Sequence, residues 1–133
     1  MLIKIPKLTE YDDSRSLILT YFKILNVINP KASTILTDNE IRVLTEFTLL
    51  PEKYSYQRFS KYAKPVIIQS LKLQYNWTLT PANLNTKIYD LIGKEYLWRD
   101  EDGVVYIKKW LLDTIKRLSL VDKQLVLDFS YGN

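Results

Sequence analysis

Apolar residues recur at helical spacing through most of this chain, whereas strict alternation of apolar and polar residues is confined to its two ends and one internal hairpin. Residues three or four positions apart share one face of a helix, so this repeat indicates helices with one buried side. We predict helices over 15–28, 38–50, 65–73, 81–93 and 108–118. A shorter helix is predicted over 55–62, where Tyr56, Phe59 and Tyr62 would lie together.

Capping residues mark where two of these helices begin. Thr37-Asp-Asn-Glu40 is a capping box, in which the threonine hydroxyl accepts from the Glu40 amide and the Glu40 carboxylate reaches back. Thr80 followed by Pro81 is typical of an N-cap and a first helical residue. One apolar face of the helix over 81–93 is then made by Leu84, Ile88 and Leu91. The outward positions of this helix are Ala82, Thr86, Tyr89, Asp90 and Gly93.

Strand-like runs over 95–99 and 104–107 follow this helix, and Asp100-Glu-Asp-Gly103 joins them as a turn. Gly103 stands where such a turn is expected to need a positive φ. The alternating ends of the chain, 2–8 and 123–131, are also predicted as strands. They either pair within the chain or add a strand to a neighbouring subunit. The predicted fold class is mainly α with a small β-sheet.

The order of the helices over 37–50, 65–73 and 81–93 and the hairpin over 95–107 resembles the winged helix-turn-helix superfamily. The resemblance is carried by the runs LTDNEIRVLTEF, LTPANLNTKIYDLIGKEYL and WRDEDGVVYI. With RFSKYAK before them, the last two runs also look like small winged-helix proteins encoded by tailed bacteriophages. Membership would imply a recognition helix at 81–93 and a wing at about 99–104. Such modules bind DNA or dock proteins.

On this basis the chain is expected to fold as one compact domain with three parts. These are an N-terminal strand and helix extension over 1–35, the winged helix-turn-helix over 36–107, and a C-terminal helix and strand over 108–133.

Composition argues against catalysis. The 133 residues include neither cysteine nor histidine, which excludes disulfides, thiolate or imidazole chemistry and nearly all zinc sites. No glycine-rich phosphate loop or G-x-S-x-G motif occurs. We therefore predict no enzyme activity, no cofactor, no metal site and no small-molecule substrate. No stretch approaches the ~18 apolar residues of a transmembrane helix. We expect the cytoplasm of a bacterial host or a phage virion, with no secretion and no membrane contact.

Charge changes what the resemblance suggests. The chain carries a net charge of +4, which is compatible with nucleic acid. The helical part over 65–94 has three lysines against one aspartate, but the hairpin over 95–107 sets Arg99 against four acids. A wing with Asp100, Glu101 and Asp102 at its tip would repel phosphate. Affinity for DNA depends strongly on contacts between cations and phosphates.

Two functions remain open from the sequence. We favour a structural or assembly component of a phage virion that binds neighbouring protein subunits and forms oligomers. The alternative is a sequence-specific DNA-binding transcriptional regulator that reads double-stranded DNA with the helix over 81–93. Asparagine can form two hydrogen bonds with adenine, and lysine or threonine can reach bases or phosphates.

Each function has its own candidate residues. The base-reading candidates are Asn83, Asn85, Thr86 and Lys87. A basic stripe at three-residue spacing, the candidate phosphate contact, comprises Arg58, Lys61 and Lys64. The candidate protein interface comprises Tyr89, Leu125, Leu127, Phe129 and Tyr131. The polar residues could equally form a solvated helix surface, and we assign Trp77, Trp98 and Trp110 to the core.

Overall fold

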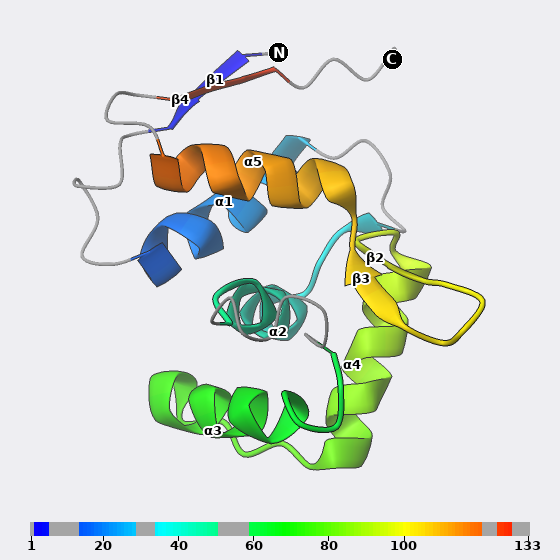
Figure 1. Cartoon of the computed structure of the whole chain (residues 1–133). Coiled ribbons are helices and arrows are strands. Elements are labelled where there is room, and N and C mark those ends of the chain that lie inside the picture. The colour runs from blue at the N-terminus through cyan, green and yellow to red at the C-terminus, as the bar shows by residue number, and fades with distance from the viewer. Residues whose placement is uncertain (1, 6–13, 29–33, 51–58, 121–124, 129–133) are drawn as a thin grey trace.

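Five helices and two pairs of strands occupy the residues that the computed structural model describes, which are 2–5, 14–28, 34–50, 59–120 and 125–128 (Figure 1). The helices are α1 (Ser14–Ile28), α2 (Asp38–Thr48), α3 (Lys64–Tyr75), α4 (Pro81–Gly93) and α5 (Lys109–Leu120). The strands are β1 (Leu2–Ile5), β2 (Leu97–Arg99), β3 (Val105–Ile107) and β4 (Leu125–Asp128). The fold is mainly α, and its small antiparallel hairpin after the helices is compatible with a winged helix.

The helix predicted over 55–62 is wrong in the part that the structure describes, because residues 59–63 form turns. The carbonyl of Ser60 accepts from the amides of Ala63 and Lys64, each at 3.1 Å. These bonds reverse the chain directly into α3, which has Pro65 in its first turn. Residues 51–58, and with them Arg58 and Tyr56, lie outside the described residues.

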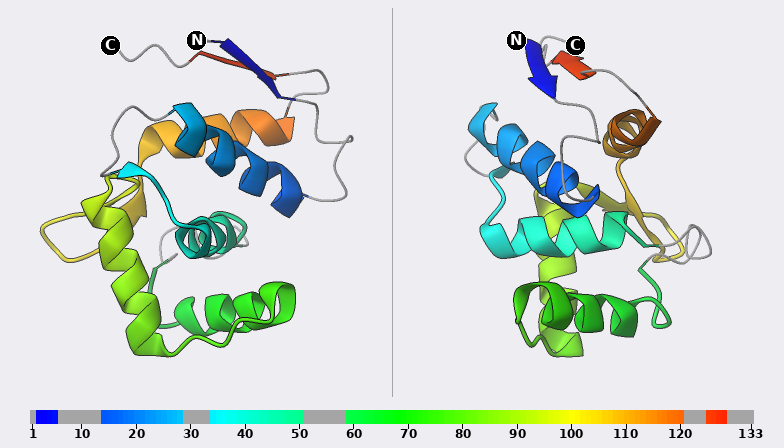
Figure 2. Two further views of the ribbon diagram at one scale, coloured as in Figure 1. Left: turned by 180° about the vertical axis from the view of Figure 1, so that it is seen from behind. Right: turned by 90° about the vertical axis from the view of Figure 1, so that its left-hand side faces the viewer.

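The two ends of the chain pair with each other. Strands β1 and β4 are antiparallel, with Leu2 opposite Asp128 and Ile5 opposite Leu125. This pair lies at the end of the molecule where α1 and α5 are found, far from α3 (Figures 1 and 2). Of the two open possibilities for the ends, the structure therefore has pairing within the chain. Phe129 and Tyr131 lie outside the described residues.

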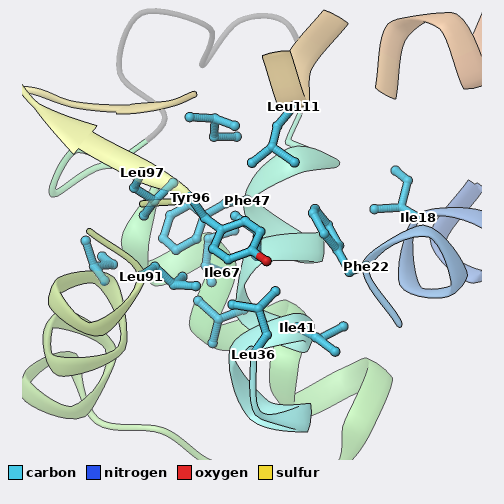
Figure 3. Packing of buried hydrophobic residues seen from close by; sticks show 14 of the residues in the cluster. Ile18, Phe22, Leu36, Ile41, Phe47, Ile67, Leu91, Tyr96, Leu97 and Leu111 are labelled. Carbon is cyan, nitrogen blue, oxygen red and sulfur yellow. The ribbon is translucent and has the colours of Figure 1, made fainter. Parts of the chain in front are cut away.

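The core lies where α1, α2, α3 and α4 meet the base of the hairpin. Figure 3 shows Phe22 of α1, Phe47 of α2, Ile67 of α3 and Leu91 of α4 converging around Tyr96. All five side chains are buried. The helical spacing of apolar residues thus predicted the buried faces of α1, α2 and α4 correctly.

Two tryptophans assigned to the core are instead exposed. Trp98 is 43% exposed and Trp110 is 50% exposed. The exposure of Trp98 follows from its place in the hairpin, because successive side chains along a strand point to opposite faces. Leu97 pairs with Ile107 and both are buried, whereas Trp98 pairs with Tyr106 and their rings stack at 4.9 Å on the other face.

A buried carboxylate joins the first three helices. Glu46 of α2 accepts two hydrogen bonds from the Arg15 guanidinium of α1, at 2.8 and 2.9 Å. It also accepts from the Tyr75 hydroxyl of α3 at 2.9 Å. Burial, together with the negative charge and hydrogen bond of Glu46, raises the pKa of Tyr75 well above its usual value. Tyr75 is therefore a neutral donor at any physiological pH.

A second buried carboxylate fixes α4 against α2. The predicted capping box is confirmed, since Thr37 N donates to Glu40 at 2.8 Å and Glu40 N donates to the Thr37 hydroxyl at 3.1 Å. Lys94, which caps the end of α4, donates to the same Glu40 oxygen and to the Ile35 carbonyl. Burial alone would raise the pKa of Glu40, but the contacts with Lys94 and Thr37 outweigh burial and lower it.

The lowered pKa of Glu40 predicts a loss of stability in acid. Because its folded pKa lies below its unfolded pKa, the stabilisation is present above the unfolded value and is lost as pH falls through the folded value. We expect Glu40→Gln to lower the free energy of unfolding by about 1–3 kcal/mol at neutral pH. This gap should shrink in urea titrations repeated at successively lower pH, down to about pH 3. Glu101→Gln at the exposed wing tip is the control, and a gap for Glu40→Gln that stays constant with pH would contradict the assignment.

Candidate functional site

A groove of about 650 Å³ lies between α4, the hairpin and the turn that precedes α3. We call it the α4–hairpin groove. Among the described residues, its lining consists of Phe59, Ser60, Lys61, Tyr62, Lys64, Asn85, Ile88, Tyr89, Arg99, Gly103, Val104 and Val105. Its volume falls within the range typical of ligand sites in proteins.

Helix α4 forms one wall of the groove. Thr80 caps this helix by accepting from Asn83 N at 3.1 Å, and Pro81 occupies its first turn as predicted. Asn85 and Tyr89 are four residues apart and so lie on one face of α4. Asn85 Oδ1 is buried and has no hydrogen-bond partner among the described residues. Tyr89 is 57% exposed, so its ring is available to a ligand.

The hairpin forms the second wall. Arg99 pairs with Val105 in the strand register, on the face that carries buried Leu97 nearer the base of the hairpin. The Arg99 guanidinium lies over the Tyr89 ring, 4.7 Å from its centroid. Such a cation–π contact contributes about 0.5–1 kcal/mol at an exposed site. It ties the hairpin to α4 across the groove.

The turn before α3 forms the third wall. Phe59 is buried, and its ring stacks on that of Phe47 at 4.2 Å. This anchor places Lys61, Tyr62 and Lys64 beside α4. Tyr62 is 64% exposed, with the Lys61 ammonium 5.2 Å from its ring centroid.

Charges on this side of the molecule are separated. The groove is lined by Lys61, Lys64 and Arg99 and by no described carboxylate, and none of these cations forms an ion pair with a described residue. The acids lie at the wing tip instead. Asp100 builds the turn there by accepting from the amides of Asp102 and Val104, each at 2.9 Å, and Gly103 has the expected positive φ of 82°.

The structure brings together residues that the sequence assigned to different functions. Lys61, Lys64 and Asn85, proposed for DNA, line the same groove as Tyr89, proposed for protein. Asn83, Thr86 and Lys87 are not among the residues lining the groove. Asn83 and Thr86 are exposed, Thr86 with its hydroxyl donating to the Ala82 carbonyl at 3.2 Å, while Lys87 is half-buried. Leu125 and Leu127 lie in β4, opposite Ile5 and Ile3.

Sequence reasoning missed Arg99 as a site residue. The net charge of the hairpin counted Arg99 together with the acids of the wing tip. That sum concealed that Arg99 lines the groove whereas the acids do not. The available signal was alternation, because Arg99 is two residues beyond Leu97 and so shares its face. Tyr62 and Val104, both exposed, were missed as site residues as well.

The described residues contain no group of three acidic side chains placed to hold a metal ion. None of the described helices is long and apolar enough to cross a membrane. No protein-family model matches the chain, and no curated protein or solved structure shows significant similarity to it.

Proposed function

We propose that this chain is a non-enzymatic winged-helix protein that binds a neighbouring protein subunit in an assembly, with the α4–hairpin groove as its docking site. The observation that carries the proposal is the composition of that groove, which combines two exposed tyrosines, three cations without an ion pair to a described residue, and apolar lining residues. Tyrosine and arginine are the residue types enriched where proteins bind each other.

The distribution of charge favours a protein over a DNA duplex. A winged helix that binds DNA places its recognition helix in the major groove and needs cations against the phosphates on either side. Here the wing tip carries Glu101 and Asp102, both exposed, and the cations line a recess. The acidic side chains at the tip would repel the phosphates of a duplex there.

The kind of assembly is inferred from the sequence. The resemblance of the runs over 80–107 to small winged-helix proteins of tailed phages supports a structural component of a phage particle. In such a particle the groove would receive a segment of an adjacent subunit.

A DNA-binding regulator is the second candidate. It is favoured by the position of Asn85 on α4 in the same groove as Lys61 and Lys64. Asparagine pairs with adenine, and the lysines would neutralise phosphates.

A salt-dependent titration with duplex DNA separates the two functions. We expect no submicromolar binding at about 50 mM salt, because a single recess of three cations offers few phosphate contacts. Tight binding that falls steeply between about 50 and 200 mM salt would overturn the proposal. Lys87→Ala on α4 and Lys109→Ala on α5 form a matched pair, and only DNA reading by α4 would make the first variant bind more weakly than the second.

A further inference from the structure

We infer that the α4–hairpin groove takes an extended, acidic segment of the partner protein. This inference rests on the proposed function and adds the chemical class of the bound segment. Three features of the groove carry it: its charge, the unpaired amide oxygen of Asn85, and its apolar surface.

The charge of the groove selects carboxylates. Lys61 lines it from the turn, Lys64 from the first residue of α3 and Arg99 from the hairpin, so cations face it from two sides. No described carboxylate lines the groove to neutralise them. A guanidinium binds a carboxylate through two parallel hydrogen bonds, and an ammonium binds it as a point charge. Aspartate or glutamate side chains of a partner would supply the missing negative charge.

The side chain of Asn85 favours a peptide over a simple anion as the ligand of the groove. Its buried Oδ1 has no donor among the described residues, and a buried acceptor is normally paired. A carboxylate or phosphate group presents acceptors and leaves this oxygen unpaired. The backbone of an extended peptide presents an N–H at every residue other than proline. One such N–H would pair with Asn85 while acidic side chains reach the cations.

The apolar surface of the groove suits an extended strand with alternating side chains. Ile88 lies on the α4 side, and Val104 and Val105 lie on the hairpin side. Successive side chains of an extended segment point in opposite directions. A segment that alternates acidic and apolar residues can therefore direct one set toward Lys61 and Lys64 and the other toward these three residues, and an acidic residue at its edge can reach Arg99 beside Val105.

The probe is an acetylated peptide of alternating glutamate and valine, titrated into the ¹⁵N-labelled full chain and followed by NMR. The matched peptide carries glutamine in place of each glutamate. We expect amide shifts at Lys61, Asn85 and Arg99, and at least about tenfold weaker binding of the glutamine peptide. The double variant Lys61→Met/Lys64→Met and the single variant Arg99→Met should each weaken binding of the glutamate peptide, and Lys109→Met should not.

The amide oxygen is tested by Asn85→Leu, which keeps the side-chain size but removes the acceptor. We expect weaker binding of the glutamate and glutamine peptides alike, since both present the same backbone N–H. Thermal unfolding of each variant verifies that it remains folded, and Asn85→Ala, which also lacks the acceptor, is the second variant if Asn85→Leu does not fold.

Three results would overturn the inference: equal binding of the two peptides, shifts confined to surfaces outside the groove, or tighter binding of an oligothymidine strand at the groove than of the glutamate peptide. Equal binding of the two peptides would leave protein docking intact and refute only the acidic class. Failure of the proposed function has a different signature, the steep salt dependence with duplex DNA.

Discussion

Replacing Glu46 with alanine should lower the free energy of unfolding by about 3–5 kcal/mol, the usual cost of removing one partner of a buried ion pair. The Glu46 side chain is almost wholly buried and accepts from Arg15 and Tyr75. Its removal takes away the acceptor that the Arg15 guanidinium and the Tyr75 hydroxyl share. Urea unfolding at neutral pH, followed by circular dichroism, measures the change.

Two further variants separate the ion pair from packing. Tyr75→Phe removes one neutral-to-charged hydrogen bond and should cost less than Glu46→Ala, about 1.5–3 kcal/mol. The double variant Arg15→Met/Glu46→Met replaces both charges by apolar groups, and we expect it to be more stable than Glu46→Met alone. If the double variant were less stable than Glu46→Met, the Arg15 charge would not depend on Glu46 and the interpretation would fail.

Replacing Phe47 with alanine should cost about 3–5 kcal/mol as well, because truncating a buried aromatic ring removes its burial and leaves a cavity. Phe47 is completely buried and stacks on Phe59, which begins the turn that carries Lys61 and Lys64. The loss should therefore reach the α4–hairpin groove, and the amide signals of that turn should shift along with those of the core. Urea unfolding gives the energy, and NMR gives the extent of the change.

Two controls fix the meaning of the Phe47 result. Tyr62→Ala removes an aromatic side chain of the same turn that is mostly exposed, so its effect should stay within about 0.5 kcal/mol. Phe47→Leu keeps much of the volume and should cost less than Phe47→Ala. A loss for Tyr62→Ala as large as that for Phe47→Ala would mean that the ring stack does not hold the turn.

Features set by local chemistry could be predicted from the sequence. The capping box at Thr37 and the cap at Thr80 depend on residues within three positions of each other, and both are present. Gly103 has its positive φ because the tight turn of the hairpin demands one there. The inward faces of α2 and α4 follow from helical periodicity alone.

Features set by contacts between distant residues could not be predicted. Arg15 and Glu46 are 31 positions apart, and nothing in either neighbourhood indicates the pairing. The groove depends on the turn at 59–63 packing beside α4, which the stack of Phe59 on Phe47 secures. Lys61, Asn85 and Tyr89 could therefore be identified as candidates, but their common location could not.

The register of β1 and β4 determines how the molecule responds to force. Leu2 lies opposite Asp128, so the outer ends of both strands are at the same end of the ladder. Tension that pulls residues 2 and 128 apart acts perpendicular to the strands and loads one pair at a time, opening the ladder like a zipper instead of shearing all of its hydrogen bonds together. Unzipping requires less force than shearing. Under tension applied to residues 2 and 128, this pair would open before the helices around Phe47 unfold.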